Sequence, residues 1–125
     1  MLRRLSPMLA LLCLAAPASA GDPERGRAVY DRCLACHALE RNRTGPKHCG
    51  LLGRRAGSLP GFDYSEAMRS AGIVWTAETL DRFLRAPLEM LPETTMTYDG
   101  IADPQERADL IAFLTLAGND PSVCR

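Results

Sequence analysis

Two cysteines and a histidine are the most chemically informative group in the sequence, in the segment Cys33-Leu34-Ala35-Cys36-His37. This C-x-x-C-H pattern has three interpretations. A structural zinc site would need four ligands, and His48-Cys49 is the only other suitable pair. A thioredoxin-like dithiol would need alternating strands and helices around it. In the third interpretation both thiols bond to the vinyl groups of one haem, and the adjacent imidazole faces the iron.

A haem held through His37 needs either a sixth ligand or an open site, and a methionine on a loop is a common sixth ligand. Met96 lies in a loop-like segment that has little other use for a methionine. Met68 has the spacing of a core residue in a short helix, and Met90 could serve either purpose. His48 is a rival ligand, but it lies only 11 residues from His37. We therefore expect Met96 to be the ligand.

The first 20 residues predict an export signal. Two arginines precede nine consecutive apolar residues, and Ala18-Ser19-Ala20 forms a small-residue cleavage site. The apolar run is too short to span a membrane, which takes roughly 20 residues. We expect residues 1–20 to be removed and residues 21–125 to form one domain without stable membrane insertion.

The charge of the chain argues against binding to nucleic acid. Removing the two arginines of the signal from the 15 basic residues leaves 13 against 15 acidic ones, a net charge of −2. The charge is also unevenly distributed, because residues 25–69 carry +5 and residues 78–120 carry −6. Such a dipole would influence how a charged partner approaches.

The chain can form only a thin hydrophobic core, because it contains seven aromatic residues in 125. Small domains of this kind often depend on disulfides, a metal or a bound group. Residues 39–60 are rich in glycine and proline, which predicts a long loop, and such a loop needs something to wrap around. Covalent haem accounts for the thin core, the long loops and the export signal together, so we favour it.

Short helices are expected to position these groups. Asp22 followed by Pro23 is typical of a helix start. Pro87 is expected to end a helix, and Gly118 to close the last one. The apolar periodicity and these signals predict an all-α fold with helices over residues 23–34, 65–71, 77–85 and 104–117 and loops over 39–60 and 88–102.

Beyond these features the chain resembles the class I c-type cytochromes, close to mitochondrial cytochrome c and its bacterial periplasmic relatives, over residues 22–118. Besides the cysteine motif, the similar segments are residues 42–46, 50–57, 62–67 and 73–75. The resemblance implies a small cytochrome c fold wrapped around one covalent haem c with its iron. It implies these site residues: Cys33 and Cys36 as attachment points, His37 and Met96 as iron ligands, Pro46 as carbonyl partner of His37, and Arg54, Tyr64 and Trp75 near the propionates.

The chain departs from the family pattern at several positions. Residues 92–95 read Pro-Glu-Thr-Thr where the family usually has Pro-Gly-Thr-Lys. Phe83 replaces a tyrosine whose hydroxyl often bonds the methionine sulfur, and Met68 replaces an asparagine. His48 occupies a position that is usually apolar. These departures concern the reduction potential and the partner surface, not the fold.

We also expect a disulfide between Cys49 and Cys124, because these two cysteines remain once Cys33 and Cys36 hold the haem and Cys13 leaves with the signal. In the family fold the end of the last helix comes near the loop that contains Cys49, so the tail after Gly118 could be pinned to that loop. Two free thiols are the alternative.

The resemblance implies an electron carrier, not an enzyme. The expected protein is a periplasmic monomer that exchanges one electron with redox proteins, such as membrane complexes or periplasmic reductases. Two alternatives remain open: a haem enzyme or gas-binding sensor with an open distal site, and a haem subunit of a larger dehydrogenase.

Overall fold

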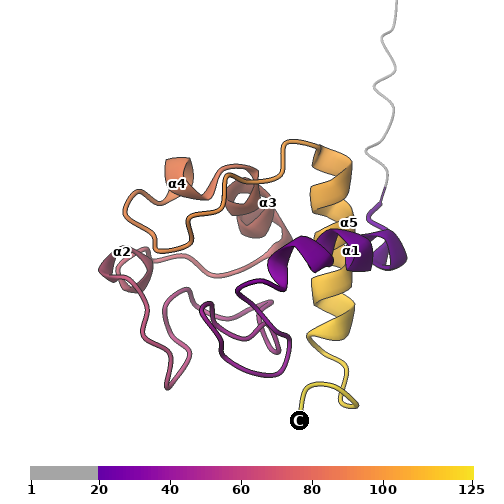
Figure 1. The fold of residues 1–125 in the computed structure, drawn as a ribbon, viewed down its shortest axis with the longest axis horizontal. Coiled ribbons are helices and arrows are strands. Elements are labelled where there is room, and N and C mark those ends of the chain that lie inside the picture. The colour runs from indigo at the N-terminus through magenta and orange to yellow at the C-terminus, as the bar shows by residue number, and fades with distance from the viewer. Residues whose placement is uncertain (1–19) are drawn as a thin grey trace, which may run out of the picture.

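The computed structural model describes residues 20–125, so the predicted export signal, apart from Ala20, lies outside the described residues. The helices are α1 (Pro23–Tyr30), the short 3-10 helix η1 (Asp31–Cys33), α2 (Glu66–Arg69), α3 (Ala77–Arg85), α4 (Pro87–Met90) and α5 (Pro104–Ala117) (Figure 1). Across residues 20–125 no strand forms, although Arg55 and Val74 make an isolated antiparallel bridge. The predicted all-α fold is confirmed. None of the helices in the described part is both long and apolar enough to cross a membrane.

Side-chain caps start the three longest helices where the sequence indicates. Asp22 and Asp103 each accept hydrogen bonds from backbone N–H groups in the first turn, and a proline follows each of them. Thr76 and Thr79 cap α3 reciprocally, each side chain bonding to the backbone N–H of the other. Local signals therefore set the starts of α1, α3 and α5.

Three helix predictions differ from the structure in detail. The first helix was expected to reach Leu34, but α1 ends at Tyr30 and the chain tightens into η1, as helix ends often do. The helix predicted over residues 65–71 is the single turn α2. Residues 87–90 form α4 inside a predicted loop, because Pro87 ends α3 and its fixed φ also suits the first position of a new helix.

Helix α1 crosses α5 at close range (Figure 1). The crossing point is Gly26, which is buried against α5. A Cβ atom there would overlap the backbone carbonyl of Asp109 and lie 2.8 Å from Cβ of Phe113. The two helix backbones can approach this closely only because residue 26 has no side chain.

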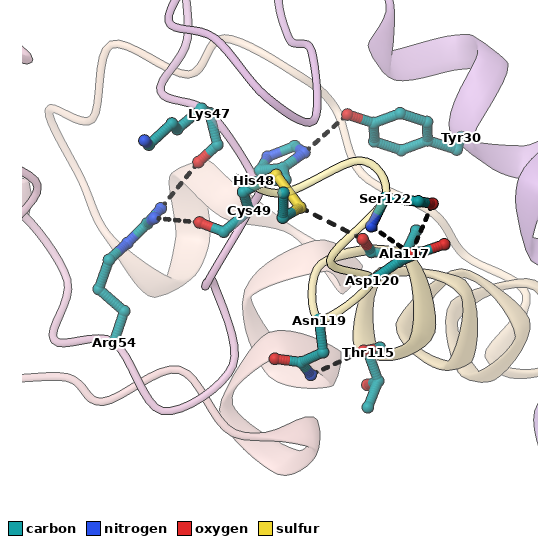
Figure 2. Close-up of a disulfide and its surroundings, with 11 residues drawn as sticks. Tyr30, Lys47, His48, Cys49, Arg54, Thr115, Ala117, Asn119, Asp120 and Ser122 are labelled. Carbon is teal, nitrogen blue, oxygen red and sulfur yellow. Dashed lines mark hydrogen bonds between the residues drawn. A yellow bond between two sulfur atoms is a disulfide. The ribbon is translucent and has the colours of Figure 1, made fainter.

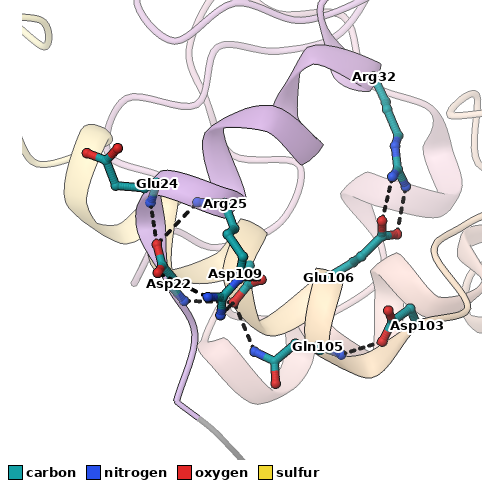
Figure 3. A network of polar contacts seen from close by, with 8 residues as sticks. All are labelled: Asp22, Glu24, Arg25, Arg32, Asp103, Gln105, Glu106 and Asp109. Atoms are coloured by element: carbon teal, nitrogen blue, oxygen red, sulfur yellow. Dashed lines mark hydrogen bonds and ion pairs between the residues drawn. The ribbon is translucent and has the colours of Figure 1, made fainter.

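A buried carboxylate joins the start of α1 to the middle of α5 (Figure 3). Asp109 accepts hydrogen bonds from Arg25 Nε at 2.8 Å, from the backbone N–H of Asp22 at 2.7 Å and from the Gln105 amide at 2.9 Å. The side chain of Asp109 is only 4% exposed. The bond from Arg25, with those from Asp22 and Gln105, holds the pKa of Asp109 well below its usual range, so the carboxylate stays ionised.

Two further arginines hold α5 to the rest of the chain. The guanidinium of Arg107 donates to Asp81 on α3 at 2.7 Å and to the carbonyls of Ile101 and Ala102, both at 2.9 Å. Nearer the surface, Arg32 makes two bonds to Glu106, at 2.6 and 2.8 Å (Figure 3). Helix α5 is therefore tied to η1, to α3 and to the loop before it.

A disulfide joins the long loop to the tail after α5 (Figure 2). Cys49 and Cys124 are bonded, with their Cα atoms 5.4 Å apart, inside the usual range for a disulfide. The backbone N–H of Gly50 also donates to the carbonyl of Gly118 at 3.0 Å. The loop around residues 48–50 is thus held to the end of α5 by a covalent bond and a hydrogen bond.

Replacing Gly26 with alanine should destabilise the fold by about 3 kcal/mol, the upper end of the usual cost of overpacking. An exposed helical glycine would show the opposite sign, since alanine is normally the better helix former. Denaturant unfolding of Gly26→Ala and of the exposed control Arg27→Ala measures this effect. An unchanged midpoint for Gly26→Ala would contradict the close crossing.

Removing the disulfide should lower the free energy of unfolding by up to roughly 4.5 kcal/mol, the chain-entropy value for a separation of 75 residues. The double variant Cys49→Ala/Cys124→Ala and the reduced wild-type protein should unfold at similar denaturant concentrations. Alkylation of the unfolded, unreduced protein is the independent check. Modification of both Cys49 and Cys124 would show that the bond is absent.

Candidate haem site

Cys33 and Cys36 lie on a tight turn that directly follows α1. Cys33 ends η1, and its carbonyl accepts hydrogen bonds from the backbone N–H groups of Cys36 at 3.1 Å and His37 at 2.9 Å. Neither cysteine is in a disulfide, and Cys33 is half-buried while Cys36 is exposed. Burial raises the pKa of the Cys33 thiol to about 11. A reactive redox dithiol needs the opposite shift, so this environment does not favour the thioredoxin-like interpretation.

The imidazole of His37 is buried and held with one nitrogen left free. Its Nδ1 donates to the carbonyl of Pro46 at 2.8 Å, which leaves the lone pair on Nε2. Gly45 lies against the same ring, and its backbone N–H donates to the carbonyl of Cys36 at 2.8 Å. A Cβ atom at Gly45 would overlap the His37 ring. The predicted hydrogen bond between His37 and Pro46 is therefore present. It forms because the loop that contains Gly45 and Pro46 passes directly over the imidazole.

The predicted site residues line one cavity of about 330 Å³ at the centre of the fold. Cofactor sites usually fall in this range and combine apolar walls with a few polar groups. All eight residues predicted to hold the haem line this cavity: Cys33, Cys36, His37, Pro46, Arg54, Tyr64, Trp75 and Met96.

Met96 reaches this cavity from the loop after α4. Its backbone N–H donates to the hydroxyl of the buried Thr94 at 3.3 Å. Glu93, where the family usually has glycine, adopts φ of 67°. Met68 also lines the cavity, whereas Met90 is not among the lining residues. The loop therefore places Met96, and not Met90, among the groups around His37.

The three residues predicted near the propionates have different surroundings. Arg54 donates to the carbonyls of Lys47 at 2.9 Å and Cys49 at 3.2 Å, so its guanidinium braces the long loop. The hydroxyl of Tyr64 accepts a bond from the backbone N–H of Leu59 at 3.3 Å. Trp75 is buried against Phe83, with ring centroids 5.1 Å apart. All three residues line the cavity.

Two residues at the site were not expected from the sequence to act together. His48 stacks on the ring of His37, with centroids 4.2 Å apart and planes inclined by 21°. Its Nδ1 shares a hydrogen bond of 3.0 Å with the hydroxyl of Tyr30 (Figure 2). The sequence did indicate that His48 is unusual, because it is a histidine at a usually apolar position. Its partner Tyr30 lies 18 residues away, and nothing in the sequence marked it as a contact of His48.

The donors in the cavity suit a covalent haem better than a metal ion alone. They include the thiols of Cys33 and Cys36, the imidazole of His37 with a free Nε2 and the thioether of Met96, and the side chains of His48 and Met68 line the same cavity. No cluster of three or more histidine, cysteine or acidic side chains able to hold a metal ion occurs in the described part of the chain. The zinc interpretation therefore lacks its ligands among residues 20–125.

Comparison with known proteins agrees with this chemistry. The family model for cytochrome c matches residues 23–116. Cytochrome c2 of Rhodomicrobium vannielii is 42% identical over 108 residues, covering 84% of this chain and 86% of its own length. Cytochrome c2 of Blastochloris viridis is 37% identical over 118 residues, covering 92% and 93%.

A solved structure is also similar. Cytochrome cH from Methylobacterium extorquens superposes with a TM-score of 0.75 and 35% identity, covering 77% of this chain and 99% of that one. The family model spans the cysteine motif, α1 to α4 and all but the last residue of α5. On these grounds the chain belongs to the cytochrome c family.

Proposed function

We propose that this chain is a single-haem electron carrier whose iron is held by His37 and Met96. The observation that supports it most directly is the shared cavity, in which two thiols, a free imidazole nitrogen and a thioether meet. Haem c, when bound, supplies an iron that cycles between its ferric and ferrous states.

The residues of the chain divide the work of holding this group. Cys33 and Cys36 form the covalent links, and their short turn fixes how His37 enters the cavity. The carbonyl of Pro46 holds the proton on Nδ1 and so keeps Nε2 available as a ligand. Met96, on the opposite loop, completes the ligand set, which excludes small molecules from the iron.

Arg54, Tyr64 and Trp75 contribute polar groups to the cavity wall and are proposed to face the propionates. Arg54 is already held by two loop carbonyls, so it also stiffens the loop around the group. Phe83 lines the same cavity without a hydroxyl, so the sulfur of Met96 lacks the phenolic hydrogen bond that many relatives provide.

The proposed location is the periplasm, and the proposed partners are redox proteins, such as membrane complexes or periplasmic reductases. The predicted export signal and the bacterial cytochrome c2 relatives support this location. In the sequence on either side of Met96 the exposed charges are acidic (Glu89, Glu93 and Asp99), whereas residues 25–69 are basic overall. A charge dipole, weakened by added salt, would orient the encounters.

Covalent attachment predicts that the denatured holoprotein keeps one haem in its mass spectrum. The double variant Cys33→Ala/Cys36→Ala should lose it on extraction, because no thioether bond remains. Cys49→Ala/Cys124→Ala is the matched control, since it also removes two sulfurs, and it should keep the haem. An apo mass for the wild-type protein would refute the proposal.

Ligation by Met96 predicts that the reduced wild-type protein does not bind carbon monoxide. Met96→Ala should open the site and bind it stoichiometrically, with loss of the methionine-to-iron charge-transfer band in the oxidised form. Met90→Ala, on the neighbouring helix but away from the cavity, should behave like the wild type. Ready binding of carbon monoxide by the wild-type protein would favour the open-site enzyme or sensor instead.

A further inference from the structure

The ring of His48 covers one face of the His37 imidazole. The two centroids are 4.2 Å apart and the planes are nearly parallel, at 21°. The hydrogen bond from His37 Nδ1 to the carbonyl of Pro46 fixes where that nitrogen points. A single hydrogen bond still lets the ring rotate about the line that joins the two atoms. The backbone of Gly45 lies against the ring, and the stacked ring of His48 further restricts that freedom. An aliphatic side chain at position 48 would have no flat face with which to do so.

His48 is itself held by Tyr30. The hydroxyl of Tyr30 and Nδ1 of His48 are 3.0 Å apart, and the two rings meet edge to face with centroids 5.6 Å apart. Tyr30 is buried at the end of α1 and packs on Phe113 of α5, at 5.1 Å between centroids. Burial raises the pKa of Tyr30 to about 12, so its hydroxyl remains protonated. Tyr30 thus links the orientation of the His48 ring to the packing of α1 against α5.

The backbone of this segment is fixed on two sides. The N–H of His48 lies within hydrogen-bond reach of the carbonyls of Ala38 and Leu39, at 3.2 and 3.0 Å, directly after His37 in the chain. On the other side Cys49 is bonded to Cys124 in the tail (Figure 2). His48 therefore cannot move away from His37 without disturbing the chain after the motif or the disulfide.

We infer that His48 is a positioning residue for the axial histidine: stacked on His37, aligned by the hydroxyl of Tyr30 and anchored through Cys49–Cys124, it sets the plane of the ligand ring. This inference rests on the proposed function, because it gives His37 the role of iron ligand. The plane of an axial imidazole selects the iron d orbital with which its π electrons interact. It thereby determines how unpaired spin is distributed over the oxidised porphyrin.

The test is the proton NMR spectrum of the oxidised holoprotein, in which the order and spread of the haem methyl shifts report the orientations of both iron ligands. Because His48 contacts the His37 ring, substitutions at position 48 act on the contribution of His37. His48→Leu puts an aliphatic group in place of the flat ring and should change this pattern most. His48→Phe keeps a flat ring and should stay closer to the wild type. Tyr30→Phe removes only the hydroxyl and should shift the pattern in the direction of His48→Leu by a smaller amount. Thr115→Val removes a hydroxyl bonded within α5, outside this contact, and should leave the pattern unchanged.

The outcomes separate this inference from the proposed function. A wild-type pattern in His48→Leu overturns it, and so do equal changes in His48→Leu and His48→Phe, since stacking would then not matter. If His48→Leu does not accumulate as holoprotein, Tyr30→Phe decides, and an unchanged pattern there overturns the inference. Mass and carbon monoxide measurements on the same samples show whether the haem is covalent and six-coordinate, so a failure of the proposed function is recognised independently.

Discussion

The close contact between α1 and α5 is the constraint on which the remaining structure depends. Val29 and Tyr30 of α1 belong to the same buried apolar cluster as Leu110 and Leu114 of α5. Gly26 lets the two backbones meet, and the buried carboxylate of Asp109 ties the start of α1 to α5. The end of α1 then delivers the cysteine motif, and the end of α5 delivers the tail that carries Cys124. The cysteine motif and the tail that carries Cys124 are therefore both positioned by one helix crossing.

The long loop over residues 39–60 is ordered by polar contacts more than by its own secondary structure. Its carbonyls at Pro46, Lys47 and Cys49 accept from His37 and Arg54. The disulfide and the bond between Gly50 and Gly118 fix its other side. The glycines of this segment give it a large conformational entropy to lose on folding. A cross-link and a set of buried hydrogen bonds are the means by which a small domain offsets that loss.

The loop that carries Met96 shows a different compromise. Glu93 adopts the left-handed conformation that relatives fill with glycine, at a cost of about 1 kcal/mol. The buried Thr94 and the turn of α4 hold the segment in place despite that cost. Backbone strain of this kind is common at functional sites. The residues beside Glu93 add further acidic charge, because Glu89 and Asp99 flank the same loop.

The sequence by itself determined the chemistry and the starts of the main helices. Cys33, Cys36 and His37 are recognisable from spacing alone, and the caps at Asp22, Thr76 and Asp103 act on the first turn that follows them. Each of these signals extends over only a few consecutive residues, so it can be recognised in the sequence without knowledge of the tertiary structure. Only the tertiary structure decided that His48 stacks on His37 beneath Tyr30, that Arg54 braces two loop carbonyls and that Gly26 is the crossing point. These contacts depend on the path of an irregular loop and on the angle between two helices, because each joins groups that no local pattern brings together.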